Sequence, residues 1–184
     1  MRSFLEWLGQ TPWSIALLES FWVWPLVEST HVLALGLFAG TAWMMDLRLL
    51  GLSFRAVPVS EFRNRMLPWT RGGFAVMAVT GFLLLYSNPV RYYHNIFFRV
   101  KVILLVVAAV NVWWFHARTY RRVAEWDRDP RPPQAVRVAG AVSLLVWALV
   151  VVTGRFIAYN WFDCDIQPQP DFVNWASGCV LQAE

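Results

Sequence analysis

The chain has 184 residues, of which 58% are hydrophobic and only 15% are charged, and its formal net charge is +4. Soluble domains carry about 45–50% apolar and about 25% charged residues, so this composition excludes an ordinary soluble domain. The basic residues gather in loops between apolar stretches, and membrane topology explains the positive charge without nucleic-acid binding.

The N-terminal segment 1–20 is amphipathic and is interrupted by Pro12. A cleavable signal peptide places a positive region before a short apolar core, and this segment does not follow that pattern. It predicts a broken helix that lies in the outer membrane interface, with Trp7 and Trp13 as anchors.

Four apolar stretches follow, and a membrane-crossing helix needs roughly 20 such residues. They cover residues 21–45, 73–86, 96–115 and 138–158. The second stretch is short unless residues 69–72 belong to it. The sequence therefore predicts an all-α protein, with a four-transmembrane-helix bundle over residues 21–159 and an outer-side tail over residues 160–184.

The first span carries an acid and an imidazole on one face. At 100° per residue, one stripe contains Glu28, His31, Leu35, Phe38, Ala42 and Asp46. Ionisable residues inside a span are costly and are candidates for function. Glu28 can reach His31 across one turn and fix its tautomer or relay protons.

Other residues of the first span are expected to be structural. Gly36 and Gly40 form a GxxxG pattern on the side opposite the stripe, where another helix can approach closely. Asp46 and Arg48, at the inner end of the span, are expected to form an ion pair.

The third span carries the other two histidines. If its helix begins near Tyr93, one face contains His94, Lys101, Leu105, Ala108, Val112 and His116. A non-covalent b-type haem needs two imidazoles at similar depth on facing helices. His31 differs in depth from His94 by about 10 Å and from His116 by nearly 20 Å, at 1.5 Å per residue.

His31 with His94 is therefore the preferred metal-ligand pair. Arg91, Arg99 and Arg155 lie near enough to the outer surface to bind the haem propionates. Histidines close to a membrane interface also occur without any cofactor, and this alternative stays open.

Arginines concentrate in the first and third loops, whereas the C-terminal tail is acidic. These two loops hold eleven of the 16 basic residues. Positive loops stay cytoplasmic. We expect a multi-pass protein of the bacterial inner membrane with both termini on the periplasmic side.

Both cysteines, Cys164 and Cys179, lie in the tail. In an oxidising compartment this spacing favours one disulfide that closes a small loop, and two free thiols are the alternative. The chain contains no CxxCH motif, so covalent attachment of c-type haem is excluded.

Three sequence segments resemble a family of bacterial four-helix inner-membrane proteins of unknown function. The segments are W-P-x-x-E-x-x-H followed by D-L-R-L-L-G, then Y-Y-H-N with F-R-V-K, and G-R-F-I-A-Y. The resemblance extends to about Tyr159, leaves the tail outside, and implies the topology given above. The residues that carry it are Glu28, His31, Asp46, Arg48, Lys101 and Arg155. By helix count and histidine placement the chain is also loosely similar to membrane b-type cytochromes and copper-resistance D-type proteins.

Two functional hypotheses follow. The first is a membrane subunit that binds b-type haem through His31 and passes electrons between the quinone pool and an outer-side redox partner. The second is a cofactor-free accessory or anchor subunit, which the 12 tryptophans and the GxxxG face favour. Copper binding ranks last, because Met44 and Met45 lie about three turns deeper than His31. No nucleophile–base constellation indicates catalysis, and whether the chain is an enzyme is left open.

Overall fold

The structure is a computed structural model that describes residues 2–179, and its regular elements in that range are all helices. Four of these helices are long and apolar enough to cross a membrane, which makes the chain a multi-pass membrane protein. They are α3 (Val23–Leu49), α4 (Val59–Ser87), α6 (Ile96–Trp114), which continues through short π, 3-10 and α segments to Trp126, and α8 (Gln134–Ile157). The prediction of an all-α four-helix bundle is confirmed.

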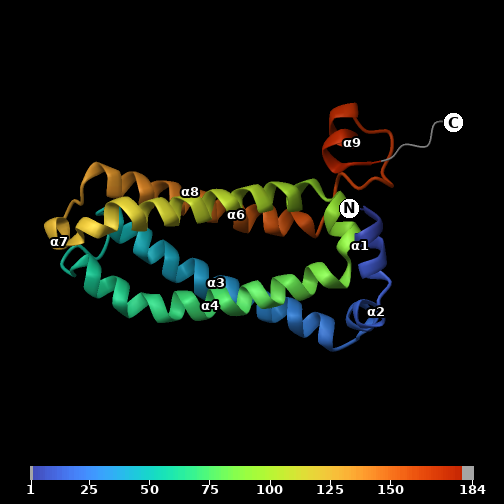
Figure 1. Cartoon of the computed structure of the whole chain (residues 1–184), viewed down its shortest axis with the longest axis horizontal. Helices are drawn as coiled ribbons and strands as arrows, with labels where there is room; N and C mark the ends of the chain where they lie inside the picture. The colour runs from blue at the N-terminus through green and yellow to red at the C-terminus, as the bar shows by residue number, and fades with distance from the viewer. Residues whose placement is uncertain (1, 180–184) are drawn as a thin grey trace.

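The bundle has two distinct ends (Figure 1). Four short helices lie at one end, which we call the tail end: α1 (Arg2–Gly9), α2 (Pro12–Glu19), α5 (Pro89–His94) and α9 (Asp171–Ser177). The loop between α3 and α4 and the short helix α7 (Val123–Trp126) lie at the other, which we call the loop end. This arrangement agrees with a chain that crosses the membrane an even number of times.

The N-terminal segment forms two short helices, α1 (Arg2–Gly9) and α2 (Pro12–Glu19), as the break at Pro12 predicted. The Thr11 and Tyr86 hydroxyls lie 2.7 Å apart, and the buried Ser14 hydroxyl donates to the Tyr86 carbonyl at 2.8 Å. These bonds fasten the segment to the end of α4.

Helix α4 is much longer than the apolar stretch that predicted it. It begins at Val59, so its first turns carry polar residues and Pro68 before the apolar part starts. Ser60 stabilises this early start, because Asp127 accepts hydrogen bonds from both its backbone N–H and its hydroxyl at 2.7 Å. The cap comes from a residue distant in sequence, which explains why the apolar pattern did not predict it.

The helices pack as two pairs, α3 with α4 and α6 with α8, joined by contacts between α3 and α8. The buried core lies where the pairs meet, and the Phe38 and Trp147 rings contact each other edge to face at 4.5 Å between centroids. Helices α4 and α6 do not share an extensive contact within the described chain. The bundle is therefore open on the side between them.

The glycine that brings α3 and α4 together is Gly73, not the predicted GxxxG pair. A Cβ built on Gly73 would lie 3.0 Å from the Phe38 backbone nitrogen, so α3 and α4 approach closely there. Gly36 and Gly40 have no such neighbour within 4 Å among the described residues. The prediction was wrong within this chain because α3 turns its His31 stripe, rather than its glycine side, toward the other helices.

The expected ion pair between Asp46 and Arg48 is also absent from the described residues. The fully buried Arg48 side chain donates instead to three backbone carbonyls, of Val57 at 2.9 Å, Asp129 at 3.3 Å and Asp127 at 3.4 Å. Residues two positions apart are separated by about 200° around the helix axis, so the Asp46 and Arg48 side chains leave opposite sides of α3. Arg48 joins the two loops at the loop end.

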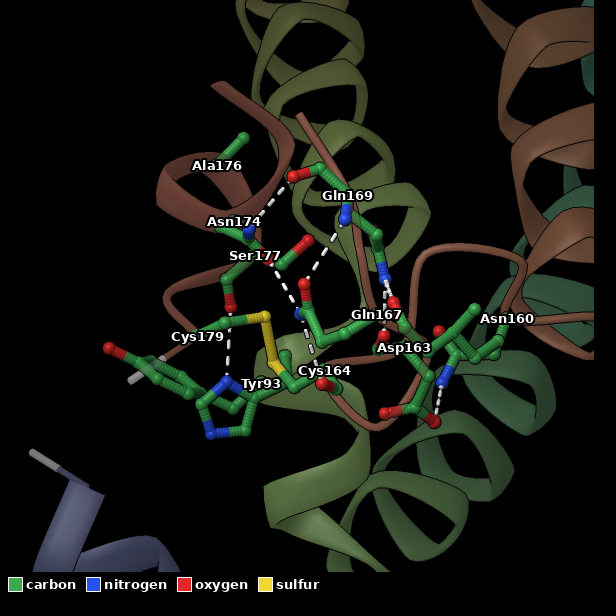
Figure 2. Close-up of a disulfide and its surroundings, with 12 residues drawn as sticks. Tyr93, Asn160, Asp163, Cys164, Gln167, Gln169, Asn174, Ala176, Ser177 and Cys179 are labelled. Atoms are coloured by element: carbon green, nitrogen blue, oxygen red, sulfur yellow. Dashed lines mark hydrogen bonds between the residues drawn. A yellow bond between two sulfur atoms is a disulfide. The ribbon is translucent and has the colours of Figure 1, made fainter. Parts of the chain in front are cut away.

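The tail after α8 includes a compact loop closed by a disulfide (Figure 2), and it contacts His94 and Arg99 through Ala176 and Ser177. Cys164 and Cys179 form a disulfide, which confirms the predicted pairing. Inside the closed loop, the Gln167 side chain donates to Asn174 of α9 (Asp171–Ser177) at 2.9 Å, and Asn174 donates to the Gln169 carbonyl at 3.2 Å.

Candidate functional site

A lateral groove of about 860 Å³ lies between α4 and α6, with α3 and α8 as its floor. This volume is within the range of small-molecule and cofactor pockets, about 300–1,000 Å³. The wall is mostly apolar, and on the open side Phe82, Val102 and Trp113 are exposed. Polar side chains in the lining are His31, Asp46, Arg63, Thr70, Arg71, Lys101, Asn111, His116 and Ser143.

Both predicted helix stripes face this groove. On α3, all the stripe residues from His31 to Asp46 line it, and Glu28 does not. On α6, the residues from Lys101 to His116 line it, and His94 does not. The helical period predicted the groove-facing sides of α3 and α6 correctly. Only the residue of each stripe nearest the tail end, Glu28 or His94, lies outside the groove lining.

The His31 imidazole is held against α4 by two adjacent small residues. Its Nδ1 lies 3.0 Å from the Thr80 hydroxyl oxygen, which itself donates to the Val76 carbonyl at 2.7 Å. A Cβ on Gly81 would lie 3.0 Å from His31 Cε1, so the ring rests where this glycine has no side chain. Nε2 makes no hydrogen bond within the part of the chain that the structure describes.

The sequence did not predict Thr80 and Gly81 as partners of His31. They occur as a small polar and a small apolar residue between the bulky residues Val79 and Phe82. That pair is the signal that marks where a side chain from another helix approaches α4, but the pairing partner follows only from the tertiary packing.

Lys101 lies across the groove from His31 on α6. Its side chain crosses toward α8, where a Cβ on Gly154 would lie 3.4 Å from Nζ. Both Lys101 and His31 line the groove. This part of the groove therefore combines one imidazole and one ammonium group.

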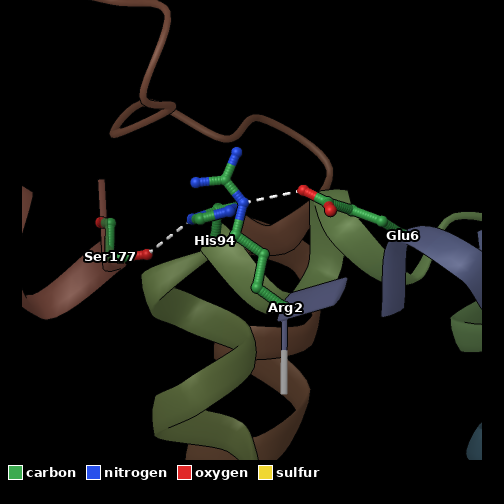
Figure 3. Close-up of polar contacts among 4 residues, drawn as sticks. All are labelled: Arg2, Glu6, His94 and Ser177. Atoms are coloured by element: carbon green, nitrogen blue, oxygen red, sulfur yellow. Dashed lines mark hydrogen bonds and ion pairs between the residues drawn. The ribbon is translucent and has the colours of Figure 1, made fainter. Parts of the chain in front are cut away.

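His94 lies outside the groove, because a helix boundary precedes the third span. Helix α5 (Pro89–His94) ends at His94, and Asn95 caps α6 by accepting the Phe98 N–H at 3.1 Å. His94 Nδ1 donates to the Ser177 carbonyl of the tail at 3.1 Å. Figure 3 shows it there, together with the Arg2–Glu6 ion pair of α1, which packs against α5.

Glu28 is exposed and forms no hydrogen bond or ion pair with His31 among residues 2–179. Its charge acts on Tyr92 of α5. Burial raises the pKa of the Tyr92 phenol, Arg91 opposes this shift, and the Glu28 carboxylate adds to it. Glu28 thus belongs to the polar surroundings of the tail end.

The three arginines expected to bind propionates also lie outside the groove lining. Arg91 is exposed on α5, and Arg155 donates to the Tyr159 hydroxyl at 3.1 Å. Arg99 donates to the carbonyls of Tyr93 at 2.9 Å, Ala176 at 2.7 Å and Ser177 at 3.1 Å. Arg99 therefore anchors the tail.

His116 lines the groove at the loop end, far from His31. Its ring lies 5.7 Å from that of Tyr120, on which Arg63 of α4 stacks. Along α4, Arg63 and Thr80 are about 25 Å apart at 1.5 Å per residue. His31 and His116 therefore cannot bind one iron, and residues 2–179 contain no group of three or more His, Cys, Asp or Glu side chains that could hold a metal ion.

The contact between Arg99 and the tail gives a first prediction. Gly178 has φ +69°, and a Cβ there would lie 2.7 Å from the Arg99 guanidinium. Gly178→Val should therefore release α9 from the bundle, because valine is strained at this φ and displaces Arg99. We expect faster amide hydrogen exchange at 171–179 in this variant, with Ala176→Val as the control. Unchanged exchange would show that Arg99 does not hold the tail.

No curated protein and no solved structure matches the chain. One family model does match, over residues 2–160, which includes all four spans and excludes the disulfide-closed tail. The likeness to b-type cytochromes is not tested by this match and stays a prediction. Because the match covers most of the chain, the protein belongs to the family of unknown function DUF6644.

Proposed function

We propose that this chain is a subunit of the bacterial inner membrane that binds a membrane quinone in the groove between α4 and α6. In this proposal the tail end is periplasmic, and the subunit passes electrons between the quinone pool and an outer-side redox partner. The observation that carries it is the His31 imidazole, fixed by Thr80, facing an apolar groove that is open where α4 and α6 separate. A quinone dissolved in the bilayer can enter such a groove from the side.

The hydrogen bonds of Thr80 assign the tautomer of His31. The Thr80 hydroxyl gives its proton to the Val76 carbonyl, so its oxygen accepts the proton on His31 Nδ1. A neutral imidazole then has an unprotonated Nε2, which accepts a hydrogen bond. Nε2 suits the hydroxyl of the reduced quinol, and the Lys101 ammonium can donate to a second oxygen of the head group.

A b-type haem is the second candidate, since a histidine fixed through Nδ1 is typical of metal ligands. The groove fits only part of such a site. It offers one imidazole at the depth of His31, because His94 lies outside the lining and His116 is far along the groove. A Soret band that disappears in His31→Ala would favour haem over quinol.

A cofactor-free anchor subunit is favoured by a different observation. Gly36 and Gly40 face open space in the described chain, so this side of α3 is free for a helix of another protein. Stoichiometric co-purification with a membrane partner that is lost in Gly40→Leu, with unchanged quinone binding, would support the anchor role beside the redox role.

The quinone proposal is tested by affinity measurements on the purified chain in detergent. Trp113 and Trp147 line the groove, so a short-chain ubiquinone should quench their fluorescence, and ubiquinol should compete with it. His31→Phe keeps a ring and removes both nitrogens. We expect it to weaken ubiquinol binding by about tenfold, which corresponds to about 1.4 kcal/mol for one lost hydrogen bond.

Two variants make this result specific. His94→Phe, outside the groove, should bind both forms as the natural chain does. Thr80→Val removes the hydroxyl that fixes the tautomer, so the preference for ubiquinol over ubiquinone should shrink. Equal affinities in His31→Phe and His94→Phe would contradict the proposal.

A further inference from the structure

A second polar position lies in the loop-end half of the groove, at Asp46. Its side chain lines the groove although the residue is only 5% exposed. One carboxyl oxygen, Oδ2, is buried and has no hydrogen-bond partner within residues 2–179. Ser143 of α8 lies beside the carboxyl in the same wall. Buried carboxyl oxygens without partners are rare, so this one needs an explanation.

The charged groups around Asp46 do not neutralise it in the described chain. On its own helix, Arg48 is directed to the loop carbonyls, and His31 lies four turns away. Helix α4 contributes Arg63, which stacks on Tyr120, and the exposed Arg71. Helix α6 and its extension contribute Lys101, at the His31 level, and His116. The residues of α8 that line the groove carry no titratable side chain: Ala139, Ser143, Trp147 and Val150.

We infer that Asp46 is a proton-binding site of the groove, which takes up and releases a proton through the loop end. An unpaired carboxylate among apolar side chains is costly, and proton uptake removes that cost. The groove gives the proton a route, because its lining continues from Asp46 to Arg63 and to the exposed His116 at the loop end. The inference concerns the groove itself and does not depend on what occupies its tail-end half.

Dicyclohexylcarbodiimide, an apolar reagent for protonated carboxyls, provides the test. The Asp46 O–H adds across one C=N bond of the reagent, and the O-acylisourea rearranges to a stable N-acylurea without a further reactant. Mass spectrometry of the natural chain should locate this adduct on Asp46 at about pH 6 and show it fading by about pH 9. The exposed Glu61 should react only with a water-soluble carbodiimide.

Two adjacent residues of α6 form a matched control for entry through the groove. Ala109 lines the groove, whereas Val110 is exposed outside it. Ala109→Trp should reduce labelling of Asp46 at least about fivefold, and Val110→Trp should leave it unchanged. Equal labelling of both variants would overturn access through the groove.

Absence of the adduct in the natural chain at about pH 6, or an adduct equally strong at about pH 9, would overturn the inference. Both results are obtained without changing Asp46, so they do not depend on whether Asp46→Asn folds. Quinone plays no part in the labelling, so a failure of the quinone proposal would leave this result unaffected.

Discussion

Replacing Arg48 with leucine should destabilise the protein by on the order of 3–5 kcal/mol. The Arg48 side chain is fully buried and donates to the carbonyls of Val57, Asp127 and Asp129. Leucine would leave the Val57 and Asp129 carbonyls without a donor, whereas the Asp127 carbonyl still accepts the Val59 N–H at 3.0 Å. Each buried polar group left unsatisfied costs about 1–3 kcal/mol. The free energy of unfolding can be measured by titrating dodecyl sulfate into detergent micelles and following tryptophan fluorescence.

Arg65→Leu is the control for this experiment. Arg65 is exposed and forms an ion pair with Glu61 one turn away, and such surface pairs contribute about 0–1 kcal/mol. Arg48→Leu and Arg65→Leu remove the same charge from the same end of the bundle. Similar stabilities of the two variants would show that the Arg48 contacts contribute little.

Arg48 adds polar ties to the loop end, where Leu49 of α3, Val59 of α4 and Val136 of α8 already pack in a buried apolar cluster. Arg48 belongs to α3, and Val57 lies in the loop after it, whereas Asp127 and Asp129 precede α8. Asp127 also accepts a hydrogen bond from the Ser60 N–H at the start of α4. One buried arginine thus connects the ends of three spans by hydrogen bonds.

The sequence predicted the four spans because lipid contact requires long apolar stretches, which are visible as runs of apolar residues along the chain. It also predicted the groove faces of α3 and α6, since a helical stripe follows from the period of 3.6 residues. The prediction that His94 belongs to the third span was wrong, because Asn95 caps α6 and the helix begins after it. An asparagine is a good helix cap, but nothing in the apolar pattern shows which polar residue near a boundary acts as one.

The residues that contact the groove-facing sides of α3 and α6 could not be predicted from the sequence. His31 contacts Thr80 and Gly81 because α3 packs on α4, and two apolar helices can pair in many ways with similar periodicity. The hydrogen-bond partners of Arg48 could not be predicted either, because they are backbone carbonyls, which every residue has. Partners of this kind are specified by the tertiary packing, so a single sequence shows the candidate side chain without its contacts.

Gly73→Leu should cost about 3 kcal/mol of stability, because the new side chain would meet backbone rather than movable side chains. The Cβ alone would lie 3.0 Å from the Phe38 nitrogen and 3.2 Å from the Ala34 carbonyl oxygen. The helices α3 and α4 must separate to admit it, and overpacked cores typically lose 1–3 kcal/mol, occasionally more. Gly72, the neighbouring residue, has nothing within 4 Å, so Gly72→Leu should be neutral or slightly stabilising through helix propensity.

The same pair of variants connects packing to the candidate site. Thr80 lies about two helical turns from Gly73 on α4, so separation of the helices at Gly73 should also move Thr80 away from His31. We expect Gly73→Leu to lose the preference for ubiquinol as Thr80→Val does, while Gly72→Leu keeps it.

A Gly73→Leu variant as stable as Gly72→Leu would show that α3 and α4 do not approach closely there. If Gly73→Leu is destabilised but keeps the ubiquinol preference, the His31–Thr80 contact is independent of this packing point.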